Sequence, residues 1–251
     1  MNGHHTVCET LLRGTRFDPG GFAEYVRVPA INVDRGVFKF GEEVSYEDAT
    51  FVEPLGCVIR GQRIARLRPG NTVFVVGCGI SGQLHIQAAR TMGAGRIIAM
   101  DTIPFRLDMA KRFGADAVIP TEEDVSEKVR ALNNGMLADL VVICRGKWIP
   151  QALESVERGG TLLFFAGARK DDRIPTPVNT LFWRTEITLT SSYAAPPADS
   201  IAALNLIRSK RVPVNEMITH RLPLADAVRG FHLLTHPMEQ DSMKVVIEPQ
   251  R

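Results

Sequence analysis

The sequence contains only four cysteines, no long apolar run and little net charge. The cysteines lie far apart without a CxxC pair, so we expect no disulfide framework and favour a reducing compartment, the cytoplasm. No apolar stretch approaches membrane-spanning length, and the first residues lack the apolar core of a secretory signal. The formal net charge is +2, and no basic stripe is present, which argues against a nucleic-acid partner. These absences favour a cytoplasmic enzyme or binding protein.

Short apolar runs recur through the middle of the chain. They begin near Val73, Ile97, Ala117, Leu140 and Leu162, at intervals of 24, 20, 23 and 22 residues. Each interval suits one strand, one helix and two short loops. The runs are continuously apolar, which is typical of strands buried on both faces of a parallel sheet. The spacing therefore predicts an α/β fold with a doubly wound parallel sheet.

The segments between these runs carry helical signals. Apolar residues four apart follow Ile80, Pro104 opens a second helix, and a third is expected from Trp148 to Val156 before two glycines. Residues 15–40 contain Gly-rich, alternating pieces that predict short strands. Beyond the repeating part, we expect a strand over 185–193, helices over 198–210 and 224–235, and a last strand over 244–248.

A glycine-rich turn joins the first strand to the first helix. It has the pattern GxGxxG, formed by Gly77, Gly79 and Gly82, with Ile80 and Ser81 between them. The first glycine permits the tight turn, the second lets a pyrophosphate approach the backbone, and the third lets the helix pack on the strand. The pattern alone is weak, but here a strand precedes it and a helix follows. We predict a dinucleotide-binding Rossmann domain with the anion at the helix N-terminus.

Asp101 follows the second strand, 19 residues after Gly82. A carboxylate there can accept the ribose hydroxyls of NAD, and it would repel the extra phosphate of NADP. No arginine adjoins it in sequence, so we expect NAD as the cofactor. Asp101 can also be interpreted as a helix-capping residue before Pro104. Arg106 is a candidate for contact with the adenine, and equally for a solvated helix position.

The histidines give no clear metal pattern. His85 lies off the apolar stripe of its helix and is expected on the solvated surface. His232 and His236 are four residues apart, but no HExxH pattern surrounds them, so we do not expect them to bind a metal.

Several segments together resemble one family, the zinc-dependent medium-chain alcohol dehydrogenases, and within it the polyol (sorbitol) and threonine dehydrogenase branch. The similar segments are GGFAEYVRVP (20–29), VEPLGC (52–57), VVGCGISGQLHIQAA (75–89), AKRFGADAVI (110–119), GGTLLFFAG (159–167), EITLTSSY (186–193), ITHRLPLADAVRGF (218–231) and KVVIEP (244–249). The resemblance covers nearly the whole chain.

The resemblance implies oxidation of a secondary alcohol or polyol to a ketone, with hydride transfer to NAD. A catalytic zinc would bind the alcohol oxygen and stabilise the alkoxide. In the polyol branch the glutamate of the EP motif stands at this zinc, and here that residue is Glu53. Without the family, Glu53 would be interpreted as a surface carboxylate. The family also implies a homodimer or homotetramer, with 185–193 at the outer edge of the sheet.

One departure from the family bears on the metal. Cys8 matches the last cysteine of a structural-zinc lobe, and its three partners are missing, as are the other catalytic ligands. We therefore expect an N-terminally truncated member in which zinc belongs to the full-length parent and is doubtful in this chain. The expected parts are a remnant of the β-rich GroES-like catalytic domain (1–58), the Rossmann domain (59–192) and a return to the catalytic domain (193–251).

Two alternatives stay open. One is a catalytically silent NAD-binding module, and the other is a zinc-independent NAD(P)H reductase of the same superfamily. Asp101 and Glu53 both argue against the reductase.

Overall fold

The computed structural model describes residues 5–10, 16–120, 122–168, 170–171, 173–174, 178–238 and 240–250. The chain divides into two units. One comprises residues 57–192, and the other comprises residues 1–56 together with 193–251.

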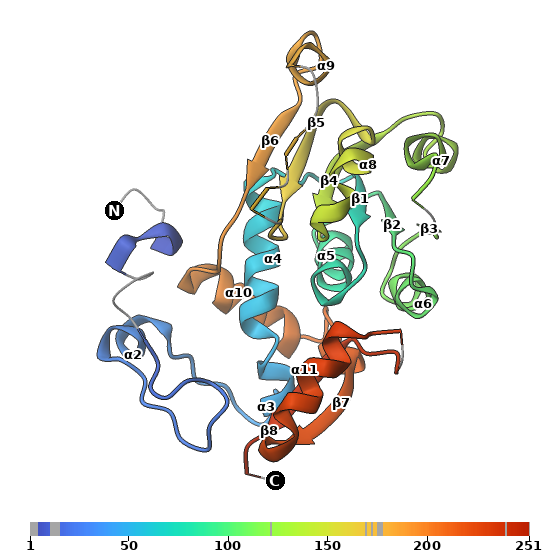
Figure 1. The fold of residues 1–251 in the computed structure, drawn as a ribbon. Helices are drawn as coiled ribbons and strands as arrows, with labels where there is room; N and C mark the ends of the chain where they lie inside the picture. Colours follow the sequence, from blue (N-terminus) through green and yellow to red (C-terminus); the bar gives the residue numbers. More distant parts are fainter. Residues whose placement is uncertain are drawn as a thin grey trace. The chain divides into compact units, whose positions relative to one another are not determined.

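A six-stranded, fully parallel sheet forms the centre of residues 57–192 (Figure 1). Its spatial order is β3-β2-β1-β4-β5-β6. The strands are β1 (Thr72–Val76), β2 (Arg96–Met100), β3 (Ala117–Ile119), β4 (Ala138–Ile143), β5 (Val156–Phe164) and β6 (Thr188–Ser191). Sequence neighbours that do not pair, such as β3 and β4, mark the point where the winding of the sheet reverses, between β1 and β4.

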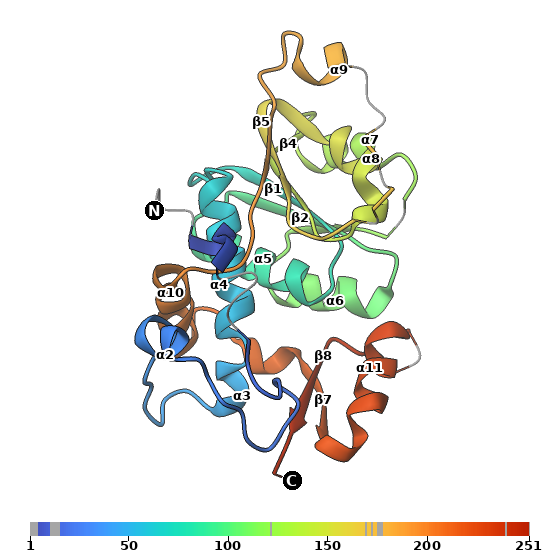
Figure 2. The same ribbon diagram turned by 60° about the vertical axis from the view of Figure 1, so that its left-hand side comes forward.

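Helices connect these strands and cover both faces of the sheet (Figures 1 and 2). They are α4 (Val52–Ile64), which begins in the other unit, α5 (Ile80–Thr91), α6 (Pro104–Arg112), α7 (Val125–Leu132), η2 (Gly146–Trp148), α8 (Ile149–Leu153) and α9 (Val178–Phe182).

The central strand β1 is buried along its whole length because both of its faces are covered. Phe74 and Val76 belong to an apolar core cluster with Val129 of α7 and Ala152 of α8. Val75 points to the opposite face, where it lies against the first turn of α5. Alternation along a strand sends successive side chains to opposite faces, so a strand between two helical layers must be apolar throughout.

The doubly wound parallel sheet predicted from the apolar runs is therefore confirmed, and β6 confirms a strand within 185–193 at the outer edge of the sheet. One boundary was wrong. The expected helix over 148–156 ends at Leu153, and Val156 already begins β5, so the two glycines lie within a strand. The apolar spacing of Trp148, Ala152 and Val156 fits a helix, but Val156 pairs with Ala138 of β4.

The other unit is mainly helical in the residues that are described. It contains η1 (His5–Val7), α2 (Ala30–Gly36), α3 (Tyr46–Ala49), α10 (Pro197–Arg208), η3 (Val214–Met217), η4 (Leu224–Asp226) and α11 (Ala227–Thr235), with a parallel pair of strands, β7 (Ile218–Pro223) and β8 (Lys244–Glu248). The helices and the final strand expected after residue 197 are confirmed.

The strands expected over 15–40 are wrong for the described residues 16–40. Only one isolated bridge forms there, between Asp18 and Arg27, and Ala30–Gly36 is helical. A strand is stable only beside a partner, and apart from that bridge the described part of this segment has none. The β-rich character expected for residues 1–58 is absent from 16–58 for the same reason.

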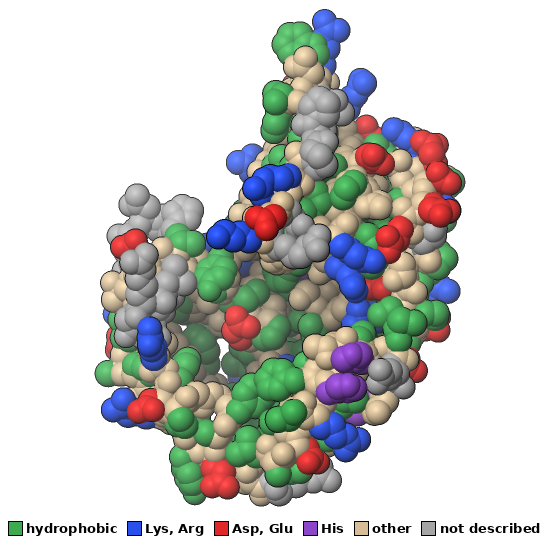
Figure 3. Space-filling model, viewed as in Figure 1, with side chains coloured by type: hydrophobic (Ala, Val, Ile, Leu, Met, Phe, Trp, Pro, Cys, Tyr) green, Lys and Arg blue, Asp and Glu red, His purple; other side chains and the backbone are tan. Residues whose placement is uncertain are grey.

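Acidic and basic side chains are interspersed over the face shown in Figure 3, so a broad patch of one sign does not form there. Among the described residues, no helix is both long enough and apolar enough to cross a membrane.

His85 is fully buried, so the prediction of a solvated position is wrong. Helix α5 packs against the sheet on one side and against α4 on another, where the Gln62 amide of α4 lies 3.1 Å from His85 Nδ1 and donates to the His85 carbonyl. The imidazole also meets the ring of Phe165 edge-on at 4.4 Å. Burial lowers the pKa of His85 to about 3.

This burial predicts an acid-dependent loss of stability. In the unfolded chain the His85 pKa returns to about 6.5, so below that pH the unfolded state binds a proton that the folded state does not take up until about pH 3. Between these two pKa values the free energy of unfolding falls by about 1.4 kcal/mol for each pH unit of acidification. The loss between pH 7 and pH 5 is therefore about 2 kcal/mol. Urea unfolding of the wild type and of His85→Gln at pH 7 and pH 5 measures this term. Between pH 7 and pH 5, the free energy of unfolding of the variant should fall by about 2 kcal/mol less than that of the wild type. Equal falls in the two proteins would contradict the prediction.

Candidate dinucleotide site

The glycine-rich turn leaves the carboxyl end of β1 and leads directly into α5. Gly77 has a φ of +100°, which an L-residue rarely adopts, and its N–H donates to the carbonyl of Met100 on β2. Gly79 is the N-cap of α5. A Cβ on Gly82 would overlap the Gly77 carbonyl oxygen. The packing of the turn itself therefore requires glycine at 77 and at 82.

Gly79 is different, because neither its backbone conformation nor any described neighbour requires a glycine there. Its φ is −67°, and the nearest atoms to an added Cβ, in the Arg106 guanidinium, are 4.0 Å away. Gly79, Ile80 and Ser81 are also half-exposed, while the residues on either side are buried. The backbone at Gly79 is therefore accessible at the N-terminus of α5. Free N–H groups and the helix dipole favour an anion at this position.

Asp101 lies immediately after β2 and is fully buried. Its Oδ2 accepts the Cys78 N–H of the turn at 2.8 Å, and its Oδ1 accepts the N–H groups of Thr102 and Ile103 at 2.7 and 3.1 Å. The carboxylate therefore ties the glycine-rich turn to the loop after β2. It occupies the predicted place beside the turn, but the alternative interpretation as a helix cap is wrong, because the N-cap of α6 is Ile103 and no side chain caps that helix.

Arg106 lies on the first turns of α6, with its Nη1 3.9 Å from Asp101 Oδ2 and its side chain only 14% exposed. Burial lowers the pKa of Arg106, and the charge of Asp101 opposes that shift. The expectation that no arginine adjoins Asp101 holds along the sequence but is wrong in space, because the helix that starts at Pro104 brings residue 106 back over residue 101. The carboxylate and the guanidinium form one charged pair at the site.

Two further residues at this edge of the sheet were not predicted. Gln83 donates from its amide to the carbonyls of Cys78 and Arg106, at 2.9 and 2.8 Å, so it joins the turn to α6. Arg145 follows β4, and its Cβ lies 3.0 Å from where a Cβ of Gly77 would be. Its exposed guanidinium lies over Trp148, 5.2 Å from the ring centroid. The sequence does contain a signal for Arg145, because this residue comes just after a predicted buried strand. Ligands of doubly wound folds bind beyond the carboxyl ends of the parallel strands.

The predicted metal residues do not come together. Glu53 is exposed in the first turn of α4, with Cys57 one turn further along the same helix, which continues past Pro54. Its charge acts on Lys244, whose pKa is lowered by burial and raised by Glu53. Cys8 is half-buried just after η1. Among the described residues, no group of three or more His, Cys, Asp or Glu gathers where it could hold a metal ion. His232 and His236 stack on each other at 4.2 Å.

The fold and this turn define a class, the doubly wound dinucleotide-binding domains. A family model described as "Zinc-binding dehydrogenase" matches residues 79–209, more than half of the chain. The sequence is 31% identical over 239 residues to an L-threonine 3-dehydrogenase of Bacillus licheniformis, covering 93% of this chain and 67% of that protein. It is 33% identical over 180 residues to a sorbitol dehydrogenase of Bacillus subtilis, covering 70% and 50%.

Solved structures give the same result. Alcohol dehydrogenase TADH from Thermus sp. ATN1 matches with a TM-score of 0.81 and 31% identity, over 90% of this chain and 64% of that one. A zinc-binding dehydrogenase from Sinorhizobium meliloti, solved with NADP bound, matches with a TM-score of 0.81 and 26% identity, over 92% and 66%. The chain belongs to the zinc-binding dehydrogenase family, and it spans about two thirds of the length of several of these relatives.

Proposed function

We propose that this chain binds NAD at the glycine-rich turn as the cofactor-binding part of a dehydrogenase for small alcohols or polyols, and that turnover needs a catalytic zinc site that the described residues do not complete. Gly79 carries the proposal. The turn itself accounts for glycine at 77 and 82, but only a ligand that approaches the backbone accounts for glycine at 79. The names of the relatives, threonine and sorbitol dehydrogenases, support the substrate class.

The residues of the turn fit a dinucleotide. The N-terminus of α5, from Gly79 to Ser81, would hold the pyrophosphate, and the first turn of this helix contains no acidic residue that would oppose it. A carboxylate has roughly four acceptor positions, and three of those on Asp101 are taken by backbone N–H groups, which leaves one for a ribose hydroxyl. Because Asp101 is fully buried without a ligand, the ribose would have to displace part of what covers the carboxylate. Arg106 lies beside this position and would cover the adenosine. The bound nicotinamide would supply the hydride acceptor.

A catalytic zinc does not fit the described residues. Such a site needs three protein ligands and an open position, and Glu53 contributes one carboxylate, with Cys57 next along its helix. We therefore assign no step to zinc in this chain. The second candidate function, NAD binding without turnover, rests on this observation. Cys8 remains a proposed structural-zinc ligand only in a protein that supplies its partners.

The cysteines bear on the compartment that we propose for this protein. Its four cysteines are free thiols, and Cys78 is buried, with its pKa raised by desolvation, so neither pairing nor thiolate chemistry is expected. A cytoplasmic location fits these properties.

Cofactor choice is the first prediction. Asp101 places negative charge where NADP would bring a third phosphate, so NAD should bind at least tenfold tighter, about 1.4 kcal/mol. Calorimetric titration with NAD and with NADP measures the ratio of the two affinities. The variant Asp101→Asn keeps the shape of the side chain and removes its charge, so it should reduce the preference for NAD. Asp108→Asn, on the exposed side of α6, is the matched control and should leave it unchanged. Equal affinities of the wild type for NAD and NADP would mean that Arg106 and Arg145, and not Asp101, determine binding at the adenosine ribose. That result would favour the reductase alternative.

Metal content and turnover are the second prediction. The purified chain should bind NAD, hold much less than one zinc per chain, and form no NADH from threonine, sorbitol or a panel of secondary alcohols. Elemental analysis and absorbance at the NADH band measure both. Glu53→Ala should not change NAD affinity, because Glu53 is remote in sequence from the turn and is proposed to act at the metal alone. One tightly held zinc with turnover in this chain would overturn the prediction.

Self-association is the third prediction. In the described sheet β6 is an outer strand, so one of its edges presents backbone groups without a ladder partner. We expect a two-fold dimer in which β6 pairs with its copy. Sedimentation should show a dimer for the wild type and a monomer for Leu189→Pro. Thr188→Lys, which adds a charge at an exposed edge position, should weaken the dimer while the circular dichroism stays native. A wild type that is monomeric at micromolar concentration would contradict this assembly.

A further inference from the structure

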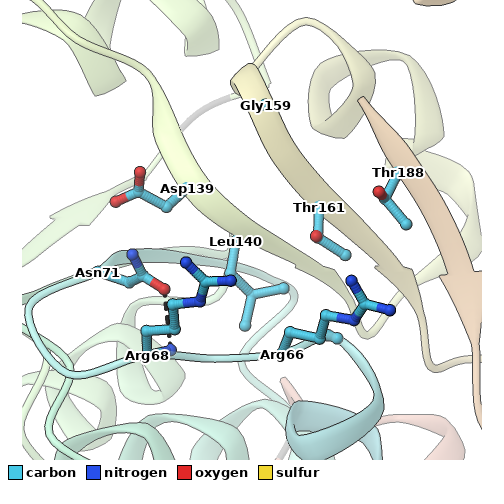
Figure 4. Close-up of a pocket in the computed structure, with 9 residues that line it drawn as sticks. Arg66, Arg68, Asn71, Asp139, Leu140, Gly159, Thr161 and Thr188 are labelled. Atoms are coloured by element: carbon cyan, nitrogen blue, oxygen red, sulfur yellow. Dashed lines mark hydrogen bonds between the residues drawn. The ribbon is translucent and has the colours of Figure 1, made fainter. Parts of the chain in front are cut away.

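A cavity lies at the amino ends of the strands, at the end of the sheet opposite to the glycine-rich turn. Its volume is about 280 Å³. Arg66, Arg68 and Asn71 of the loop between α4 and β1 form one wall, and Asp139 of β4, Thr161 of β5 and Thr188 of β6 form the other (Figure 4). All of these residues belong to the same unit as the turn. In a parallel sheet the two edges are separated by the length of the strands, so this cavity is distinct from the proposed NAD site.

The cavity carries a net positive charge. Arg66 and Arg68 are exposed, and neither guanidinium has a hydrogen bond or an ion pair with the described residues. Asp139 is the one carboxylate among the lining residues, and its Oδ2 already accepts the Thr72 N–H at 2.7 Å. Two unpaired guanidinium groups against one partly engaged carboxylate favour an anionic ligand.

The neutral groups of the cavity add hydrogen-bond capacity. Arg66 extends toward Thr161 and Thr188, whose hydroxyls face the same space (Figure 4). Asn71 Oδ1 accepts the Arg68 N–H at 2.9 Å, which leaves the amide N–H₂ of Asn71 as a donor. The unengaged oxygen of Asp139 would accept from a hydroxyl of the ligand. The complete set therefore fits an anion that also carries hydroxyl groups.

The backbone at Arg66 supports a role for its side chain. Arg66 lies two residues after the last residue of α4, Ile64, and has a φ of +57°, a conformation in which glycine is preferred because a Cβ makes it unfavourable. Several other non-glycine residues of the chain also have positive φ, so the backbone alone marks no site. At Arg66 the unfavourable conformation coincides with an unpaired guanidinium that lines a cavity.

We propose that this cavity is a second small-molecule site, which binds a hydroxylated anion such as a phosphate ester through Arg66, Arg68 and the two threonine hydroxyls. Its volume suits a ligand much smaller than a dinucleotide. The site is independent of the proposed reaction, and nothing in its geometry requires that the chain be active.

Calorimetry with glycerol 3-phosphate tests the proposal on the whole chain, with and without saturating NAD. We expect one binding site whose affinity is unaffected by NAD and falls as salt rises. The double variant Arg66→Gln/Arg68→Gln should weaken binding at least tenfold, because glutamine keeps much of the length but loses the charge. Arg229→Gln, at an exposed arginine of the other unit, is the matched control and should bind like the wild type.

Additional ligands and one milder variant test which groups of the cavity contribute to binding. Uncharged glycerol should not bind, and inorganic phosphate should bind more weakly than its ester if the threonines and Asp139 contribute. Thr161→Val gives a second, milder variant, expected to weaken ester binding several-fold without touching the arginines. Absence of binding at millimolar ester, equal binding by the double variant, or displacement by NAD would overturn the proposal. NAD titration of each variant reports folding and tests the dinucleotide site separately.

Discussion

The carboxylate of Asp101 organises the carboxyl edge of the sheet. It is fully buried, and it is stabilised by three backbone N–H groups, one from the glycine-rich turn and two from the loop after β2. A buried charge is tolerated only when it is well hydrogen-bonded, so the turn and the loop cannot separate without exposing an unsatisfied ion. The position of Gly79, the start of α5 and the placement of Arg106 all depend on this single group.

The parallel sheet explains how the two proposed sites can occupy one domain. Every strand begins at one edge and ends at the other, so residues that follow strands, such as Asp101 and Arg145, collect on one side. Residues that precede or begin strands, such as Asn71 and Thr188, collect on the opposite side. The first edge offers helix N–H groups that suit a pyrophosphate, and the second offers guanidinium groups that suit a smaller anion. The buried strands between them isolate the two chemistries.

Local patterns in the sequence were sufficient for the repeating part of the fold and for the glycine-rich turn. Each of these depends on residues close in sequence: apolar runs for strands, and a spacing of two and three for the turn. Long-range contacts decided the rest. His85 is buried because α4 covers α5, Arg106 adjoins Asp101 because α6 folds back, and residues 16–40 lack partners for a sheet. The arginine-lined cavity draws its walls from four separate segments, and no single stretch of sequence carries its signature.

The irregular pairing of β4 with β5 has a consequence for how the second site can change. Between the paired positions Ala138↔Val156 and Leu140↔Thr161, β5 advances five residues while β4 advances two. The excess residues form a bulge within β5 that contains Gly159, which lines the cavity, and the Gly159 N–H donates to the carbonyl of Thr185. Residues can be inserted or removed there without shifting the register of the ladder from Leu140 onward. The lining of the cavity can therefore change in length and shape while the rest of the β4–β5 ladder keeps its register.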